Sequence, residues 1–326
     1  MPTMLREPTR EFRTMVMDSH RWDAFEPRPD DIVIATYPKC GTTWTQRIVD
    51  LLVFQSPEPR PAMSISPWLD SVMFQPVEAD LATLEAQRHR RFVKTHLPFD
   101  AVPIWDQVKY IHVARDGRDS CMSFHNHQLG TLPEWRQGVM EKALADPRLM
   151  AAMATLPMRA GPIPADPRDF YLDWISNAEA EVTEGYGIDL PFFDFETTYW
   201  RERRRPNVLF LHYNDLKADL AGEMRRMSEF LGIATPDALM PSLVEAATFE
   251  SMKRDAAAIV PVAAEVWEGG AERFVYKGTN GRWREVLTAD DLARYEALAA
   301  RKWTPAQDAW IRGGRLVAGD PRETPD

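Results

Sequence analysis

The chain has 326 residues, of which 44% are hydrophobic and 27% are charged. This composition supplies enough apolar material for a sizeable core, so it excludes both a small disulfide-stapled scaffold and a wholly disordered chain. Lys and Arg total 39 against 49 Asp and Glu. The resulting net charge of −10 argues against a protein that binds nucleic acid over its whole surface. A local basic site for an anionic ligand is compatible with this net charge.

The cysteines and the N-terminal segment indicate the compartment. Cys40 and Cys121 are the two cysteines of the chain, so no disulfide framework exists and a reducing compartment is favoured. The first thirty residues carry charges of both signs without an apolar stretch, which excludes a secretory signal peptide. No run reaches the roughly 18 apolar residues that a membrane helix requires. We therefore expect a soluble, cytoplasmic protein.

The first structural signal is a strand followed by a helix. Residues 31–37 form a short, mostly apolar run ended by Pro38, which is typical of a buried strand in a parallel sheet. From Trp44 to Leu52, apolar residues recur at i, i+4, i+7 and i+8, the spacing of a helix that packs on a sheet.

The remaining chain continues this alternation. Strands are predicted at 92–95, 109–114 and 207–213, and helices at 81–90, 120–128, 192–203 and 220–231, the last stopped by Gly232. Strands that alternate with helices form a parallel sheet. We therefore predict an α/β fold in which helices flank a central parallel sheet, as a single domain over 1–326.

Three segments are expected to be less regular. Segment 57–67 holds four prolines and predicts an irregular connection. Segment 130–167 has no clean period and predicts helices and loops that cover a pocket. Residues 313–326 predict a polar tail.

The strand-to-helix loop carries the first chemical signal. It reads Thr36-Tyr-Pro-Lys-Cys-Gly-Thr-Thr-Trp44 and lies where unpaired helix amides and the positive end of the helix dipole form an anion site. Lys39 adds a charge, Gly41 lets the backbone approach the anion, and Thr42 and Thr43 add hydroxyls. The Walker pattern is absent, because Lys39 precedes Gly41. Alone, the segment is equally compatible with an ordinary turn that exposes a lysine.

Two further segments follow predicted strands. Lys94-Thr-His96 comes after the 92–95 strand, and a histidine there could act as a general base, although lone histidines are more often structural. Arg115 to Ser123 begins where the 109–114 strand ends, and Arg115 and Ser123 could hold a phosphate from two elements. The carboxyl ends of parallel strands share one crevice, so we expect the three segments to meet.

These segments, in this order, resemble the cytosolic PAPS-dependent sulfotransferases, and the chain is identified as a bacterial-type member of that family. PAPS, 3′-phosphoadenosine 5′-phosphosulfate, is the sulfuryl donor and PAP its product. The family patterns T-Y-P-K-S-G-T-T-W, K-T-H-L-P and R-x-x-x-D-x-x-x-S match residues 36–44, 94–98 and 115–123. Segments 207–217, 249–252 and 274–283 are similar to further family motifs. The resemblance spans roughly residues 20–300 and implies a fold like that of the P-loop kinases.

The resemblance also implies roles for individual residues. His96 would take the acceptor proton, and Lys39 and Lys94 would stabilise the charge of the transferring group. The residues implied to bind the donor are Lys39, Cys40, Gly41, Thr42, Thr43, Trp44, Arg115, Ser123, Tyr213, Phe249, Met252, Tyr276, Lys277 and Gly278. No metal is implied. The acceptor would be a small hydroxyl compound, and the Met- and aromatic-rich covering segments favour an apolar phenol, a sterol-like alcohol or a glycolipid.

Four departures from the family patterns bear on these roles. Tyr276 stands where an arginine contacts the 3′-phosphate, which predicts weaker donor binding, and Arg282 replaces an aspartate. Cys40 replaces a serine, and its place beside Lys39 at a helix N-terminus predicts a lowered pKa and a reactive thiolate, with a buried and inert thiol as the alternative. The family's dimer segment is degraded at 284–293, so a dimer of the usual kind is not supported.

Two other functions and a metal site are weighed against this one. A nucleotide kinase or other P-loop NTPase would need Mg²⁺ and the Walker order, and a catalytically silent nucleotide-binding scaffold would not need His96. His125 and His127 stand two residues apart without a ligand-spaced Cys or carboxylate nearby, so they predict surface or pocket residues and not a metal site.

Overall fold

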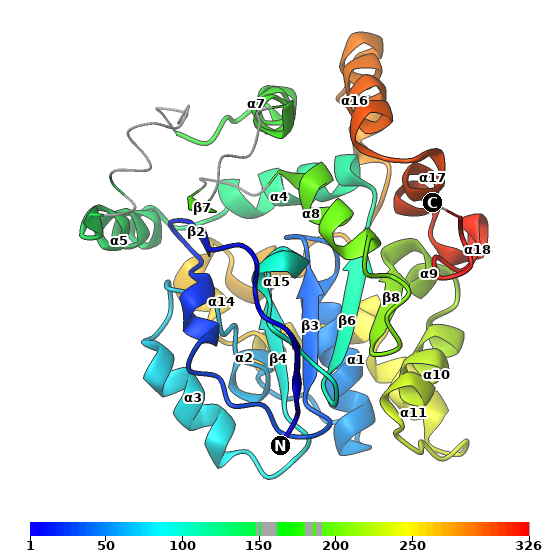
Figure 1. Ribbon diagram of the computed structural model, residues 1–326. Helices are drawn as coiled ribbons and strands as arrows, with labels where there is room; N and C mark the ends of the chain where they lie inside the picture. Colours follow the sequence, from blue (N-terminus) through cyan, green and yellow to red (C-terminus); the bar gives the residue numbers. More distant parts are fainter. Residues whose placement is uncertain (148–149, 151–161, 180–184, 187–190, 326) are drawn as a thin grey trace.

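A four-stranded parallel sheet lies at the centre of the computed structural model, which describes residues 1–147, 150, 162–179, 185–186 and 191–325 (Figure 1). Its strand order is β4-β3-β6-β8, with bounds β3 (Ile32–Thr36), β4 (Phe92–Thr95), β6 (Lys109–Ala114) and β8 (Val208–His212). The sequence predicts all four strands, to within a residue at each end. The predicted α/β class with a central parallel sheet is confirmed.

The register aligns the strands so that their carboxyl ends meet at one edge. Ile34 of β3 lies opposite Lys94 of β4 and Ile111 of β6, and Thr36 lies opposite Val113. Parallel strands cannot be joined by hairpins, so β3, β4 and β6 are each followed by a crossover connection that starts at this edge, and helix α9 begins there after β8. The loops after all four strands are therefore gathered at the same place.

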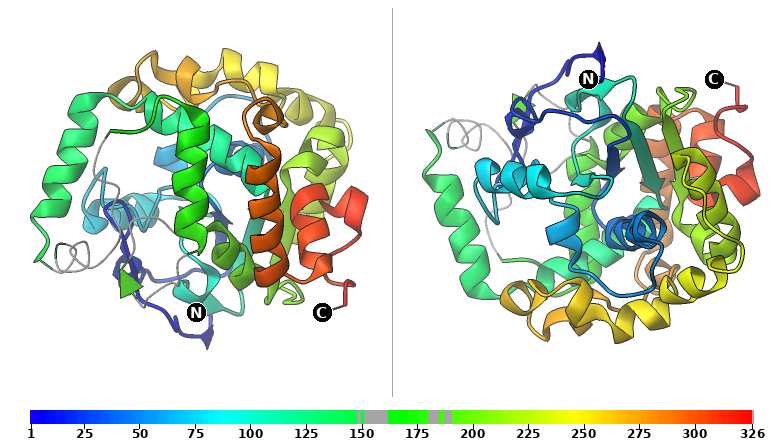
Figure 2. Two further views of the ribbon diagram at one scale, coloured as in Figure 1. Left: turned by 90° about the horizontal axis from the view of Figure 1, so that it is seen from above. Right: turned by 90° about the horizontal axis from the view of Figure 1, so that it is seen from below.

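Both faces of the sheet are buried, which explains the uninterrupted apolar run of β3. Ile32 and Ile34 face one hydrophobic cluster, and Val33 and Ala35 face the other, because side chains alternate along a strand. Figures 1 and 2 show helices on both sides of the sheet.

Two sets of helices cover these faces. The Ile32 side packs against α1 (Thr42–Phe54), α9 (Tyr213–Ala218), α10 (Leu220–Leu231) and α11 (Met240–Ala246). The Val33 side packs against α4 (Gly117–Leu129), α7 (Pro167–Glu179), α8 (Phe192–Trp200), α16 (Ala289–Lys302) and α17 (Pro305–Gly313).

Shorter elements surround this framework. The helices are α2 (Ala62–Ile65), α3 (Val77–Ala86), α5 (Pro133–Leu144), α12 (Phe249–Arg254), α13 (Ala256–Ile259), α14 (Ala263–Val266), α15 (Gly270–Phe274) and α18 (Arg315–Ala318), with 3-10 turns at Ser19–Trp22, Phe99–Ala101 and Arg282–Glu285. Two small sheets pair β1 (Met4–Arg6) with β5 (Ile104–Trp105) and β2 (Phe12–Arg13) with β7 (Gly185–Tyr186). Within the described ranges, no helix is long and apolar enough to cross a membrane.

Several predicted helices differ from the observed ones at their ends. Helix α3 precedes the predicted 81–90 segment by about one turn, and Arg90 is instead held by hydrogen bonds to the carbonyl oxygens of Asp30 and Leu231. Helix α4 begins at Gly117 because the carboxylate of Asp116 accepts from the amide of Arg118 and caps it. Helix α2 interrupts the predicted irregular segment 57–67. The predicted cover over 130–167 contains α5, and residues 148–149 and 151–161 of it lie outside the described residues.

The predicted polar tail is packed on the sheet domain. The amides of Arg315 and Leu316 donate to the carboxylate of Asp215, at 2.7 and 3.1 Å. Arg203, which is buried, donates to the carbonyl oxygen of Pro321. Hydrogen bonds to the Asp215 carboxylate and from Arg203 thus hold part of this polar segment against the rest of the chain.

A buried ion pair beneath α1 generates a prediction about stability. The side chains of Arg47 and Asp50 are each 1% exposed, and the Arg47 guanidinium donates to the Asp50 carboxylate and to the carbonyl oxygen of Glu58 at 2.8 Å. Asp50→Ala leaves a buried guanidinium without its carboxylate and should lower the free energy of unfolding by about 3–5 kcal/mol in urea titrations.

Arg60→Ala is the matched control, because the 24% exposed Arg60 pairs with the same carboxylate at 3.2 Å. A part-exposed pair contributes about 1 kcal/mol or less. Equal losses in Asp50→Ala and Arg60→Ala would contradict the assignment of the stability to the buried pair.

Candidate active site

A cavity of about 1360 Å³ opens where the carboxyl ends of the strands meet. Its walls come from the loops after β3, β4, β6 and β8, together with α5, α12, α14 and α15. The predicted site residues found in these walls are Lys39, Gly41, Thr42, Thr43, Trp44, Lys94, His96, Arg115, Ser123, Tyr213, Phe249, Met252, Tyr276, Lys277 and Gly278. The cavity thus brings together every predicted site residue except Cys40.

The loop after β3 turns tightly into α1. Lys39 has a φ of 70° and Gly41 a φ of 110°, both in the left-handed region. A Cβ added at Gly41 would lie 3.2 Å from the Tyr213 ring, so this position needs glycine for space as well as for backbone angle. Helix α1 begins at Thr42 without a side-chain cap. Its first amides are therefore directed into the cavity as an anion-binding terminus.

Cys40 does not line the cavity. Its side chain is fully buried in the hydrophobic cluster on the Val33 side, and its amide donates to the carbonyl oxygen of Tyr37 within the turn. Burial, reinforced by the charge of Glu196, raises the pKa of the Cys40 thiol. The predicted low pKa is therefore wrong: the desolvation of the thiol outweighs the helix dipole and the neighbouring cations.

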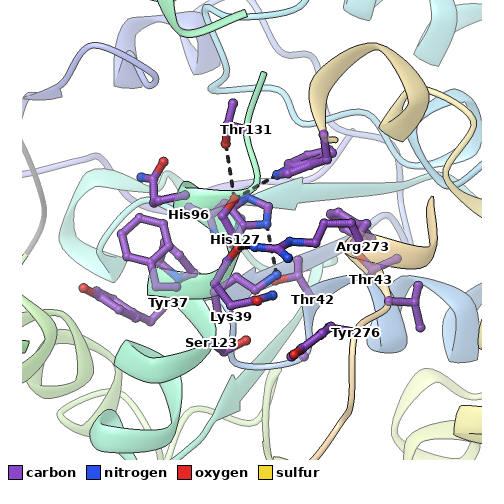
Figure 3. A pocket seen from close by; sticks show the side chains of 18 of the residues that line it. Tyr37, Lys39, Thr42, Thr43, His96, Ser123, His127, Thr131, Arg273 and Tyr276 are labelled. Atoms are coloured by element: carbon purple, nitrogen blue, oxygen red, sulfur yellow. Dashed lines mark hydrogen bonds between the residues drawn. The ribbon is translucent and has the colours of Figure 1, made fainter. Parts of the chain in front are cut away.

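Lys39 contacts a histidine that the sequence analysis leaves without a role. The Lys39 ammonium lies 3.2 Å from Nδ1 of His127 on α4 (Figure 3). It also lies 5.1 Å from the centre of the Phe274 ring. Burial lowers the pKa of Lys39 to about 7, and the charges of Arg115, Lys94 and Arg282 act in the same direction. Burial and the nearby cations also hold the pKa of His127 well below its usual range. A neutral imidazole therefore faces the ammonium as an acceptor.

His96 is held in one tautomer. Its Nδ1 lies 2.6 Å from the carbonyl oxygen of Thr36, which only accepts, so Nδ1 carries the proton and Nε2 carries the lone pair. Its backbone amide donates to Asp70 at 3.3 Å. Burial and the charge of Lys94 hold the pKa of His96 well below its usual range. The ring is a neutral base at physiological pH.

Lys94 lies beside His96 on the same strand end. Its ammonium is 4.1 Å from the centre of the Trp68 ring, and Trp68 in turn donates to the buried carboxylate of Asp70 at 2.7 Å. Burial lowers the pKa of Lys94 to about 8, and Asp70 opposes this shift. Lys94 is thus a partly buried cation in the cavity wall that the Trp68 ring supports.

Arg115 links three segments of the cavity wall. Its guanidinium lies 4.1 Å from the centre of the Tyr213 ring and donates to the side chain of Asn280 and to the carbonyl oxygens of Lys39 and Thr279. These bonds join the β3 loop, the end of β6 and the 275–281 loop at one side chain. The groups to which Arg115 donates are all neutral, and the carboxylate of Asp119 acts on Arg115 through its charge.

Aromatic side chains line the region between Arg115 and α12. Trp44 donates to the carbonyl oxygen of Ala247 at 2.7 Å and meets Tyr213 edge-on at 5.4 Å between ring centres. Gly278 has a φ of 60°, and a Cβ added there would lie 2.7 Å from the Phe249 ring. The loop at Gly278 therefore approaches Phe249 closely. The aromatic rings of Trp44, Tyr213 and Phe249 form a surface on this side on which a flat ligand can stack.

The sequence analysis misses three groups that organise this site. Asp70 supports His96 and Trp68, Asn280 fixes Arg115, and His127 contacts Lys39. Only His127 carried a signal, as a pocket histidine without a role. Among the described residues, no cluster of three or more His, Cys, Asp or Glu side chains could hold a metal ion.

Chemically, the site combines a neutral base with several cations around an anion-binding helix terminus. Such an arrangement suits the transfer of an anionic group to a hydroxyl, since it can remove the hydroxyl proton and stabilise negative charge on the leaving group.

Comparisons with known proteins agree with this geometry. The chain is similar to the glycolipid sulfotransferase of Mycobacterium bovis, with 35% identity over 313 residues that cover 93% of this chain and 94% of the relative. It is 28% identical to sulfotransferase 1A1 of Rattus norvegicus over 86% of this chain and 87% of the relative.

Solved structures share the fold. The crystal structure of retinol dehydratase with androsterone and the inactive cofactor PAP superposes with a TM-score of 0.63 at 23% identity, covering 87% of this chain and 83% of that one. Mouse sulfotransferase SULT7A1 complexed with PAP gives a TM-score of 0.60 at 21% identity, covering 87% and 88%. The family model of the sulfotransferase domain matches residues 29–304. The chain therefore belongs to the sulfotransferase domain family of enzymes.

Proposed function

We propose that the protein transfers the sulfuryl group of PAPS to a hydroxyl of an apolar acceptor, with His96 as the general base. The observation that carries this proposal is the convergence of Lys39, Lys94 and His96 from two adjacent strand ends into one cavity, with the lone pair of His96 on Nε2. The donor supplies an activated sulfuryl group on a phosphosulfate linkage. The protein then has to position the donor and the acceptor, to accept the proton of the acceptor hydroxyl and to stabilise the negative charge on the leaving nucleotide.

His96 accepts the acceptor proton at Nε2. The carbonyl oxygen of Thr36 holds the ring through Nδ1 and stabilises the imidazolium that forms when Nε2 is protonated. The nearby charge of Lys94, which together with burial lowers the pKa of His96, repels this imidazolium. The proton is therefore held transiently, and the negative charge of a bound donor offsets the repulsion.

Lys39 stabilises negative charge on the leaving nucleotide. Its ammonium exchanges the neutral Nδ1 of His127 for an anionic oxygen at the helix terminus, a stronger hydrogen-bond acceptor. The hydroxyl of Thr42 is already 2.6 Å from that of Thr36, so this pair stiffens the loop, while Thr43 is available to the anion.

The other end of the donor fits the aromatic and cationic side of the cavity. Trp44 and Phe249 would enclose the adenine, with Tyr213 and Met252 beside them. Arg115 and Ser123, with Lys277 and the backbone of Gly278, would bind the 3′-phosphate. The neutral hydrogen-bond acceptors of Arg115 and the close approach of Gly278 to Phe249 support this placement.

The acceptor is proposed to be a glycolipid. The volume exceeds the roughly 300–1,000 Å³ of a typical single-ligand pocket, so it leaves room for an acceptor beside the nucleotide. The lining from α5, α14 and α15 includes apolar and aromatic side chains, and the amide side chains of Asn126, Gln128 and Asn177 also line the cavity and suit sugar hydroxyls. The mycobacterial relative named a glycolipid sulfotransferase supports this class over a phenol or a sterol-like alcohol.

Both cysteines are free thiols, which supports a cytoplasmic location.

Replacing the base should stop the chemistry and spare donor binding. His96→Ala should lower kcat by roughly 10² to 10⁴, the usual contribution of a positioned general base, in an assay with labelled PAPS. Its affinity for PAP should change by less than about twofold, since the imidazole contacts the acceptor side.

His125→Ala is the matched control, because His125 is a buried histidine that does not line the cavity, although its ring bonds to the carbonyl oxygen of the lining residue Pro164. Retention of more than about a third of the wild-type rate by His96→Ala would refute the assignment. No turnover of PAPS by the wild-type protein would favour the silent scaffold instead, and binding of ATP with Mg²⁺ in preference to PAP would favour a kinase.

Donor binding should weaken at alkaline pH. The pKa of Lys39 is lowered to about 7 and that of Lys94 to about 8, so both cations are lost as pH rises through this range. The affinity for PAP measured by calorimetry should fall about tenfold or more between pH 7 and pH 9, because the free enzyme must take up a proton to bind.

Lys39→Arg tests the cause, since a guanidinium stays charged throughout this range. The pH dependence of PAP binding should be smaller in this variant. An unchanged slope would show that Lys39 does not titrate with donor binding.

Cys40 should be inert in the folded protein. Its thiol is buried and its pKa is raised, so alkylation should be at least about 10² slower than for a free cysteine and should not depend on PAP. Peptide mapping after limited alkylation, with and without urea, measures this. Rapid labelling of Cys40 without urea, and protection by PAP, would contradict the buried placement.

A further inference from the structure

We propose that Arg282 binds the 3′-phosphate of the donor together with Arg115, in place of the arginine that position 276 lacks. This inference rests on the proposed function, because it names a residue within the same nucleotide site. Arg282 is the first residue of the 3-10 turn Arg282–Glu285 and lines the cavity.

The turn directs Arg282 and Arg284 to different surroundings. The amide of Gly281, whose φ is 82°, donates to Asp119 at 2.6 Å and fixes the start of the turn. Trp283 is buried, with the guanidinium of Arg118 4.1 Å from its ring centre. Anchoring at these two points leaves Arg282 half-buried in the cavity wall, while Arg284 is exposed to solvent.

The electrostatic surroundings of Arg282 are those of an anion site. Burial lowers the pKa of Arg282, and the like charge of Arg115 lowers it further. Asp119 opposes this effect, but its Oδ1 is occupied by the Gly281 amide and its charge also acts on Arg115. Among the described residues, no carboxylate forms an ion pair with Arg282. Two guanidinium groups that repel each other in a cavity wall are stabilised by an anion between them.

The position of Tyr276 shows what Arg282 replaces. The Arg282 guanidinium lies 5.7 Å from the centre of the Tyr276 ring, and the Lys277 ammonium lies 5.1 Å from it. The family resemblance places a phosphate-binding arginine at position 276. Here position 276 carries a phenol, and the guanidinium near it comes from position 282. The charge is retained and its point of attachment has moved six residues along the loop.

This arrangement predicts a selective effect on the 3′-phosphate. Arg282→Ala should weaken PAP binding about tenfold or more in calorimetric titrations, because a charge-assisted hydrogen bond is lost. Binding of adenosine 5′-phosphate, which lacks the 3′-phosphate, should change by less than about twofold. Arg284→Ala, which removes an exposed arginine two residues away, should change neither affinity by more than about twofold.

Two further variants separate charge from packing. Arg282→Gln keeps the aliphatic stem and should show the same selective loss. Tyr276→Arg combined with Arg282→Ala should recover PAP affinity, since it returns the charge to the site from position 276. Arg115→Ala serves as the positive comparison and should also lose affinity for PAP more than for adenosine 5′-phosphate.

The outcomes distinguish this inference from the function on which it rests. The role of Arg282 would be overturned if Arg282→Ala and Arg282→Gln bound PAP as tightly as Arg284→Ala does. It would also be overturned if both variants lost affinity for PAP and for adenosine 5′-phosphate equally. Either result would leave the PAPS-dependent function in place. A wild-type protein that binds adenosine 5′-phosphate and PAP with equal affinity would overturn the 3′-phosphate site itself. A wild-type protein that binds neither would overturn the proposed function.

Discussion

An excess of positive charge in the walls of one cavity is the constraint on which the rest of the site depends. Lys39, Lys94, Arg115 and Arg282 face the same volume, and the charges that act on Lys39 are all positive. The chain has a net charge of −10 and therefore an excess of carboxylates. At this site, however, the carboxylates of Asp70 and Asp119 accept hydrogen bonds from backbone amides. The folded state thus carries an electrostatic cost at its binding site, and a polyanionic ligand relieves it.

The neutral and aromatic groups of the site follow from this constraint. Lys39 contacts an imidazole, Lys94 an indole ring and Arg115 an amide side chain, all of which support a cation without cancelling its charge. A carboxylate in any of these places would bind the cation more strongly and would compete with the donor. Burial, together with the charges of Lys94 and Lys39, keeps His96 neutral, which is the state that its proposed role as a base requires.

Local patterns in the sequence predict the sheet and the strand ends well, because parallel strands buried on both faces read as short apolar runs and their carboxyl ends share one edge. Lys39, His96 and Arg115 were therefore predictable. Asp70, Asn280 and His127 were not, since each meets its partner across a large sequence separation that no periodicity records. Cys40 shows the limit most clearly: its neighbours in sequence are those of a reactive thiol, while its orientation into the core is set by the left-handed turn at Lys39 and Gly41.

Under the proposed function, the shared cavity would couple the binding of the donor to that of the acceptor. An apolar acceptor that fills the region beside α5 and α14 removes water from around Lys39 and Lys94, and this raises the cost of their charges while the donor site is empty. With the donor in place, the same removal of water strengthens the attraction between the lysines and its anionic groups. Acceptor binding is thus favoured on the donor complex over the free enzyme. Cooperative binding of an apolar acceptor and an anionic donor follows from placing both beside the same buried lysines, without any movement of the sheet.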